Sequence, residues 1–66
     1  MVSVDMLRDI AARFRTRSAR YNREAHEAKG SSDKAYYSGM AMAFQLCALE
    51  VSYEIATLIK NQGGGD

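Results

Sequence analysis

The residues best suited to chemistry in this sequence are five arginines that follow one another without an intervening acid. They are Arg13, Arg15, Arg17, Arg20 and Arg23. Guanidinium groups bind phosphate oxygens, so a helix carrying them can hold a nucleic-acid backbone. The same groups can instead pair with carboxylates three or four residues away on their own helix. Such pairs are available at Asp5–Arg8, Asp9–Arg13, Arg20–Glu24 and Arg23–Glu27.

Three of these arginines form a compact edge when the segment is drawn as a helix. They are Arg13, Arg17 and Arg20, at spacings of four and three residues. From the second helix, Glu50 or Glu54 could reach Arg8, Arg13 or Arg17 across the hairpin. Tyr36 is the tyrosine most expected on the outside of a helical bundle, where tyrosine often anchors an interface. These four residues are our candidates for contact with a partner protein or a nucleic acid.

The other reactive residues lack the neighbouring side chains that catalysis or metal binding requires. His26 is followed by Glu27 but has no second histidine four residues later, so the zinc-protease helix motif fails. Cys47 falls within an apolar stripe, where we expect it to be buried and inert. The glycines at 63–65 follow a helix, so they do not form a phosphate-binding loop. We therefore predict no catalytic, metal or cofactor site and no enzyme activity.

The length of the chain, 66 residues, allows one small domain. A domain of this size buries only about 60% of its unfolded surface, so the monomer is marginally stable without additional help. One cysteine and one histidine make an internal disulfide or a structural zinc site poor explanations. Oligomerisation or docking on a partner remains as the source of stability.

Charge and hydropathy favour a cytoplasmic protein with no membrane partner. The formal net charge is +1, although residues 1–30 carry seven basic and four acidic groups. Asp5, Arg8 and Asp9 interrupt the place where a signal peptide would be apolar. The longest uncharged run, 35–49, is shorter than the roughly 18 residues expected of a spanning helix.

The chain contains no proline, and its one interior turn signal is the segment 29–33 around Gly30. A glycine there suits the left-handed position that ends a helix, and Ser31 or Ser32 can cap the next helix. We predict an all-α, two-helix antiparallel hairpin forming one domain over residues 1–61. Helix 1 covers about 4–28, the turn 29–32 and helix 2 about 32–61, and a flexible glycine-rich tail follows at 62–66.

Helix 1 has one apolar side, made of two sets of residues that recur every seventh position. One set is Leu7, Phe14, Tyr21 and Ala28, and the other is Val4, Ala11, Ser18 and Ala25. The second set consists mostly of small residues. Small side chains at this repeat allow two antiparallel helices to approach closely.

Helix 2 is apolar on two opposed sides. The first stripe contains Tyr37, Met40, Phe44, Cys47, Val51, Ile55 and Leu58. The second stripe contains Met42, Leu46, Leu49, Tyr53 and Ala56. Helix 1 can cover only one of them, so the other needs a partner. We predict that the second stripe pairs hairpins into a homodimeric four-helix bundle. Gly39 is explained by a close backbone crossing, or it simply loosens the helix.

These features favour a small non-enzymatic protein–protein interaction module that acts as a homodimeric helical bundle. Small helical proteins of phages and mobile elements often regulate or inhibit another protein in this way, so we expect an unidentified protein partner. One alternative is an RNA- or DNA-binding dimer using the arginine-rich helix, whose architecture resembles the Rop-type hairpin dimers. Another is a hairpin co-chaperone or subunit of a hetero-oligomer.

Overall fold

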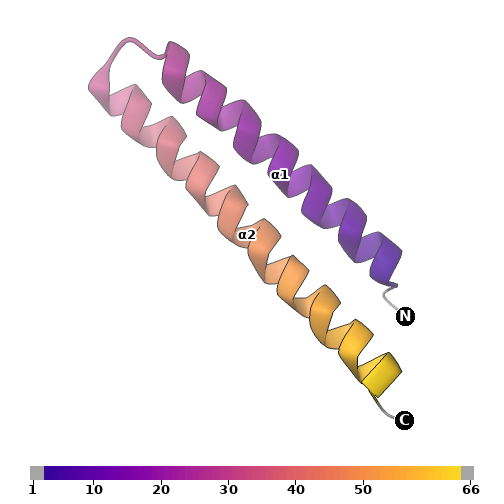
Figure 1. Ribbon diagram of the computed structural model, residues 1–66. Coiled ribbons are helices and arrows are strands. Elements are labelled where there is room, and N and C mark those ends of the chain that lie inside the picture. Colours follow the sequence, from indigo (N-terminus) through magenta and orange to yellow (C-terminus); the bar gives the residue numbers. More distant parts are fainter. Residues whose placement is uncertain (1–2, 65–66) are drawn as a thin grey trace.

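The computed structural model describes residues 3–64, with side chains described for residues 3–61. It contains two helices, α1 (Val4–Glu27) and α2 (Ser31–Gly64), which lie side by side and antiparallel (Figure 1). They form a narrow rod of 55 × 15 × 14 Å, in which α2 runs past the N-terminal end of α1. The predicted all-α hairpin is confirmed.

Helix α1 is held at both ends by local hydrogen bonds. The Ser3 hydroxyl caps it by accepting a hydrogen bond from the Met6 amide at 3.1 Å, and Asp5 lies in the first turn, where the helix dipole favours an acid. At the other end the Ala28 amide donates to the Glu24 carbonyl at 2.9 Å. Ala28 itself is extended, with ψ of 139°, and so turns the chain out of the helix.

The turn differs from its predicted form. Within the described residues no glycine has a positive φ, so Gly30 does not close α1 in the left-handed conformation. The extended Ala28 reverses the chain instead, and the Gly30 carbonyl accepts the Lys34 amide at 3.0 Å, which starts α2. Helix α2 then continues through Gly64, three residues beyond its predicted end. Of the predicted tail, residues 65–66 lie outside the described part of the chain.

The closest contact between the helices is made by small side chains. Ala11, Ala41, Ala48 and Ser18 are the buried residues of the described chain, each no more than 7% exposed. The Ser18 hydroxyl donates to the Ala41 carbonyl at 2.8 Å, a bond that a buried hydroxyl needs. Side chains this short let the backbones approach closely, and the larger residues consequently lie at the margins, only half-buried.

We predict that Ala48→Leu destabilises the hairpin by about 1–3 kcal/mol, because extra methyl groups at a closely packed position force the helices apart. Ala12→Leu is the matched control, since Ala12 lies exposed on α1 and leucine is nearly as good a helix former as alanine. Urea unfolding followed by circular dichroism measures both variants. Equal stability of the two would contradict the close approach at Ala48.

Candidate interaction surface

The second stripe of α2 lies fully open in the single chain. Met42, Leu46, Leu49 and Tyr53 are 64%, 58%, 59% and 78% exposed, and Ala56 is also exposed. Alternating spacings of four and three residues place them in one line along the helix. Helix α1 packs on the other side of α2, at Ala41 and Ala48, so it cannot cover this line. The structure therefore brings the five predicted interface residues together on an uncovered surface.

Two carboxylates border this surface. A shallow hollow is lined by Leu46, Leu49, Glu50, Tyr53 and Glu54. Among the described residues, neither glutamate forms an ion pair with an arginine of α1, so the predicted cross-hairpin pairs are not formed. The surface thus combines an apolar centre with an acidic edge.

A second apolar region follows the margin between the helices. Five rings contact one another in series there, and we call them the aromatic ladder: Phe14, Phe44, Tyr21, Tyr37 and Tyr36. The ring centroids of successive contacts are 5.3–6.2 Å apart, the separation at which aromatic pairs are favourable. Tyr36 ends the series and is 61% exposed, as expected for an outward-facing tyrosine. This margin joins both helices into one partly exposed aromatic surface.

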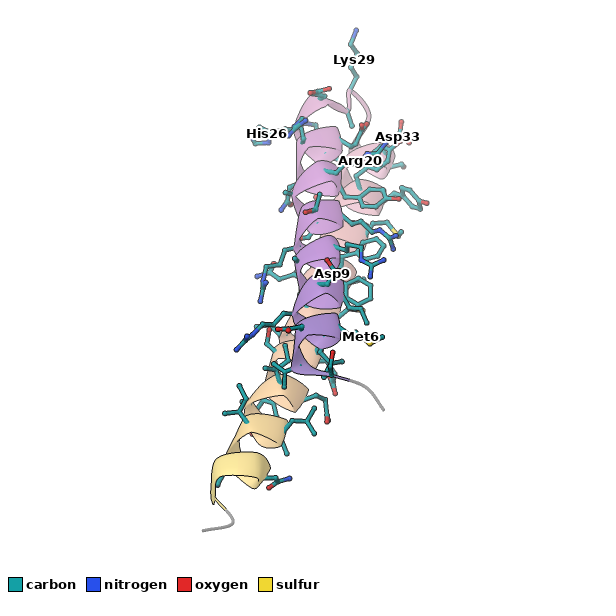
Figure 2. All side chains as sticks on the ribbon, turned by 90° about the vertical axis from the view of Figure 1, so that its right-hand side faces the viewer. Met6, Asp9, Arg20, His26, Lys29 and Asp33 are labelled. Carbon is teal, nitrogen blue, oxygen red and sulfur yellow. The ribbon has the colours of Figure 1, made fainter. Side chains whose placement is uncertain are left out.

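The candidate arginines lie beside this ladder or pair locally. The Arg17 guanidinium lies over the Phe44 ring, 5.8 Å from its centroid, within the range of a cation–π contact. Arg13 pairs with Asp9 at 2.9 Å, as predicted. Figure 2 shows Arg20 on the same side of α1 as Met6, while His26 projects to the opposite side. Arg13 is seven residues from both Met6 and Arg20, so it lies on this side too. The edge of Arg13, Arg17 and Arg20 therefore runs beside the aromatic ladder.

Of the other predicted ion pairs, Asp5–Arg8 is present at 3.8 Å between exposed side chains. Arg20–Glu24 and Arg23–Glu27 are not formed among the described residues. Arg15 has no carboxylate three or four residues away on its own helix. Its guanidinium instead donates a hydrogen bond to the Ser52 hydroxyl at 3.0 Å. That contact crosses the hairpin on the side away from the rings. It could not be found from spacing, because the partner lies on the other helix.

The prediction for Cys47 was wrong, because its side chain is exposed and lies beside the helix contact. Ala41 and Ala48 hold the central positions assigned to Met40 and Cys47. The signal was available in the sequence. Residues 37, 41, 44, 48, 51, 55 and 58 alternate at four and three, as a helix–helix seam requires. Hydropathy alone favours the larger Met40 and Cys47 over the alanines of this seam.

No group of three metal-binding side chains gathers anywhere in the described part of the chain. Helix α2 is, by length and composition alone, apolar enough to cross a membrane between Ser31 and Asn61, with a mean hydropathy of 1.3 over 18 residues. A helix covered by other protein helices meets the same criterion, and only 6% of that window is buried within the hairpin. Whether a membrane or another protein covers it, α2 has more apolar surface than α1 covers.

No protein-family model matches the chain, and comparisons with curated proteins and with solved structures give no match either. The molecule is therefore classified by its own geometry. It is an all-α helical hairpin with an uncovered apolar line on α2 and an aromatic margin between its helices.

We predict that Phe44→Ala lowers the free energy of unfolding by about 2–3 kcal/mol, less than the cost at a fully buried position because the ring is half-buried. Phe44 stacks on Tyr21 and contacts Phe14 at a tilt of 32°, so its loss interrupts the aromatic ladder. Tyr36→Ala, at the exposed end, should change stability by less than about 1 kcal/mol. Thermal and urea unfolding of both variants test this, and equal losses would count against the ladder as a stabilising element.

Proposed function

We propose that this chain is a non-enzymatic protein-interaction module, which self-associates through the second stripe into a four-helix assembly and regulates or inhibits another protein by binding it. The observation that carries this proposal is the uncovered line of Met42, Leu46, Leu49 and Tyr53, each at least 58% exposed. Contiguous apolar surface of this kind marks an interaction site on a soluble protein.

The energetics support association. Among the side chains that the structure describes, those buried within one hairpin are three alanines and a serine, which contribute little apolar burial. Full burial of a large apolar side chain contributes about 1.5–3 kcal/mol. Covering the exposed part of four such side chains therefore contributes several kcal/mol per chain, comparable to the net stability of a small domain. Association thus offers what the hairpin core lacks.

The aromatic ladder supplies a surface for the protein target. Once the second stripe is covered, Tyr36 and Arg17 still lie accessible on the ladder side. Tyrosine and arginine are the residue types that most often carry binding energy at interfaces, because each combines a large contact area with polar groups. A protein target seated here would contact both helices at once.

Packing of the hairpin also argues against membrane insertion of α2. Arg15 hydrogen-bonds to Ser52 and Arg17 lies over Phe44, so both arginines accompany the apolar segment of α2. Inserting the intact hairpin would carry these charges into the bilayer at about 2.5–3.5 kcal/mol each. We therefore propose that α2 is covered by protein.

The double substitution Leu46→Glu with Leu49→Glu tests self-association. Four charges would face one another across the dimer, and we expect the variant to sediment as a monomer with reduced thermal stability. Size-exclusion chromatography with light scattering, at matched concentrations, gives the mass directly.

The matched control is Ala12→Glu with Thr16→Glu, which adds the same charge at two exposed positions of α1. This variant should retain the mass of the unmodified protein. A monomeric unmodified protein at high micromolar concentration would refute self-association, and an unchanged mass in the leucine variant would place the contact elsewhere.

A second candidate function, nucleic-acid binding, is favoured by one observation. The edge of Arg13, Arg17 and Arg20 lies along the same side of the hairpin as the aromatic rings. Guanidinium groups beside accessible rings suit a single strand, whose phosphates and bases they can contact together. The Asp9–Arg13 pair and the Arg17–Phe44 contact compete with this use.

Reversing Arg13 and Arg17 to glutamate separates the two candidates. If the edge binds nucleic acid, the variant should lose retention of RNA or single-stranded DNA in a gel-shift assay at low salt, while its oligomeric mass stays unchanged. Lack of retention by the unmodified protein under those conditions would eliminate this candidate.

A further inference from the structure

The line of the second stripe continues along nearly the whole of α2. The alternation of four and three residues extends it to eight positions: Ala35, Gly39, Met42, Leu46, Leu49, Tyr53, Ala56 and Lys60. All eight are exposed in the hairpin. The midpoint of this line falls between Cys47 and Ala48, which is also the midpoint of α2 (Ser31–Gly64).

A line with this symmetry is self-complementary when two copies run antiparallel. The apolar seam of a coiled coil consists of two positions, a and d, in each seven-residue repeat. When two helices run antiparallel, an a residue of one helix lies opposite a d residue of the other. Centring both copies on the midpoint sets Leu46 opposite Leu49 and Met42 opposite Tyr53. Gly39 then faces Ala56, and Ala35 faces Lys60. The large apolar side chains meet in the middle, the small Gly39 and Ala56 flank them, and Ala35 and Lys60 lie at the ends.

We propose that two copies of this chain pair through α2 in this antiparallel register, with a two-fold axis at the middle of the helix. This inference rests on the proposed self-association and specifies its geometry. The interface is isologous, as in most homodimers, so each contact occurs twice.

The chain exposes more surface than a compact protein of its mass, which leaves area for a second copy to cover. The hairpin exposes 5296 Å², whereas a compact monomer of 7.3 kDa would expose about 4,200 Å². The excess, about 1,100 Å², is close to the ~800 Å² that each partner buries in a standard interface. The chain therefore has enough uncovered surface for one interface of standard size.

Gly39 gives separate support. A Cβ atom built at this residue meets no other atom of the hairpin within 4 Å, so the hairpin contains no close crossing there. The close approach that this glycine permits is therefore not made inside the hairpin, and the position is open to another chain. In the proposed register Gly39 lies against Ala56 of the second copy, where two small residues let the backbones approach.

The borders of the line are also compatible with this register. Glu50 lies nearest Ala43 of the second copy, and Gln45 lies nearest Ser52. The acidic edges of the two copies share one flank, where the two Glu50 residues are offset by five residues, about 7.5 Å along the axis, and so are not directly opposite. A shift by seven residues in one direction puts Lys60 opposite Met42. A shift in the other direction puts Leu49 opposite Gly39 and leaves Ala56 and Lys60 unpaired. The centred register alone uses all eight positions.

Cysteine cross-linking tests the register in a Cys47→Ser background. Met42→Cys and Tyr53→Cys are prepared as separate variants, mixed, and treated with a short bismaleimide. The mixture should give a dimer band at twice the chain mass, whereas each variant alone should not. In the proposed register, position 42 of one copy and position 42 of the other are eleven residues apart along the helix axis, about 16 Å. A short cross-linker therefore does not join two copies of the same variant.

Two further mixtures report shifted registers, Met42→Cys with Lys60→Cys and Tyr53→Cys with Ala35→Cys. Stronger cross-linking in either of them would overturn the centred register, and self-linking of Met42→Cys would show a parallel pair. Light scattering of the Cys47→Ser protein separates the two claims. A monomer would overturn the proposed self-association, whereas a dimer with the wrong cross-linking pattern would overturn only the register.

Discussion

Close approach of the two helices at very small side chains governs the rest of the molecule. Ala11, Ser18, Ala41 and Ala48 leave so little space between the backbones that no large side chain fits there. Every bulky apolar residue of the described chain is therefore placed at a margin or on an outer face. The hairpin is well defined in geometry but has almost no apolar core of its own.

The surplus of apolar surface on α2 follows from that constraint. Because α1 covers only the alanine side, the second stripe stays open. The aromatic ladder is half-covered, since its rings lie beside the contact and fill the groove only from one margin. The two surfaces differ in composition. One is an aliphatic line on a single helix, and the other is an aromatic surface shared by both helices. The proposed assembly assigns the aliphatic line to a copy of the same helix and the aromatic surface to another protein.

Much of the fold could be read from the sequence because the determining signals are local or periodic. The absence of proline, the break at Gly30 and the seven-residue repeats of α1 gave two helices and their facing sides. The seam of α2 was misread at two positions, where Met40 and Cys47 were preferred to Ala41 and Ala48. Which side chains are buried depends on how far apart the two helix axes lie, and the hydropathy pattern of a sequence does not give that distance.

The sequence by itself determined that α2 is apolar on two opposed sides and that Met42, Leu46, Leu49, Tyr53 and Ala56 share one of them, because helical periodicity alone fixes which residues share a side. Only the tertiary structure decided which side α1 occupies, how Arg15 and Arg17 find partners on α2, and that no described residue of α1 packs against Gly39. Those outcomes depend on contacts between residues more than twenty positions apart. Their geometry is set by how closely the two helices pack.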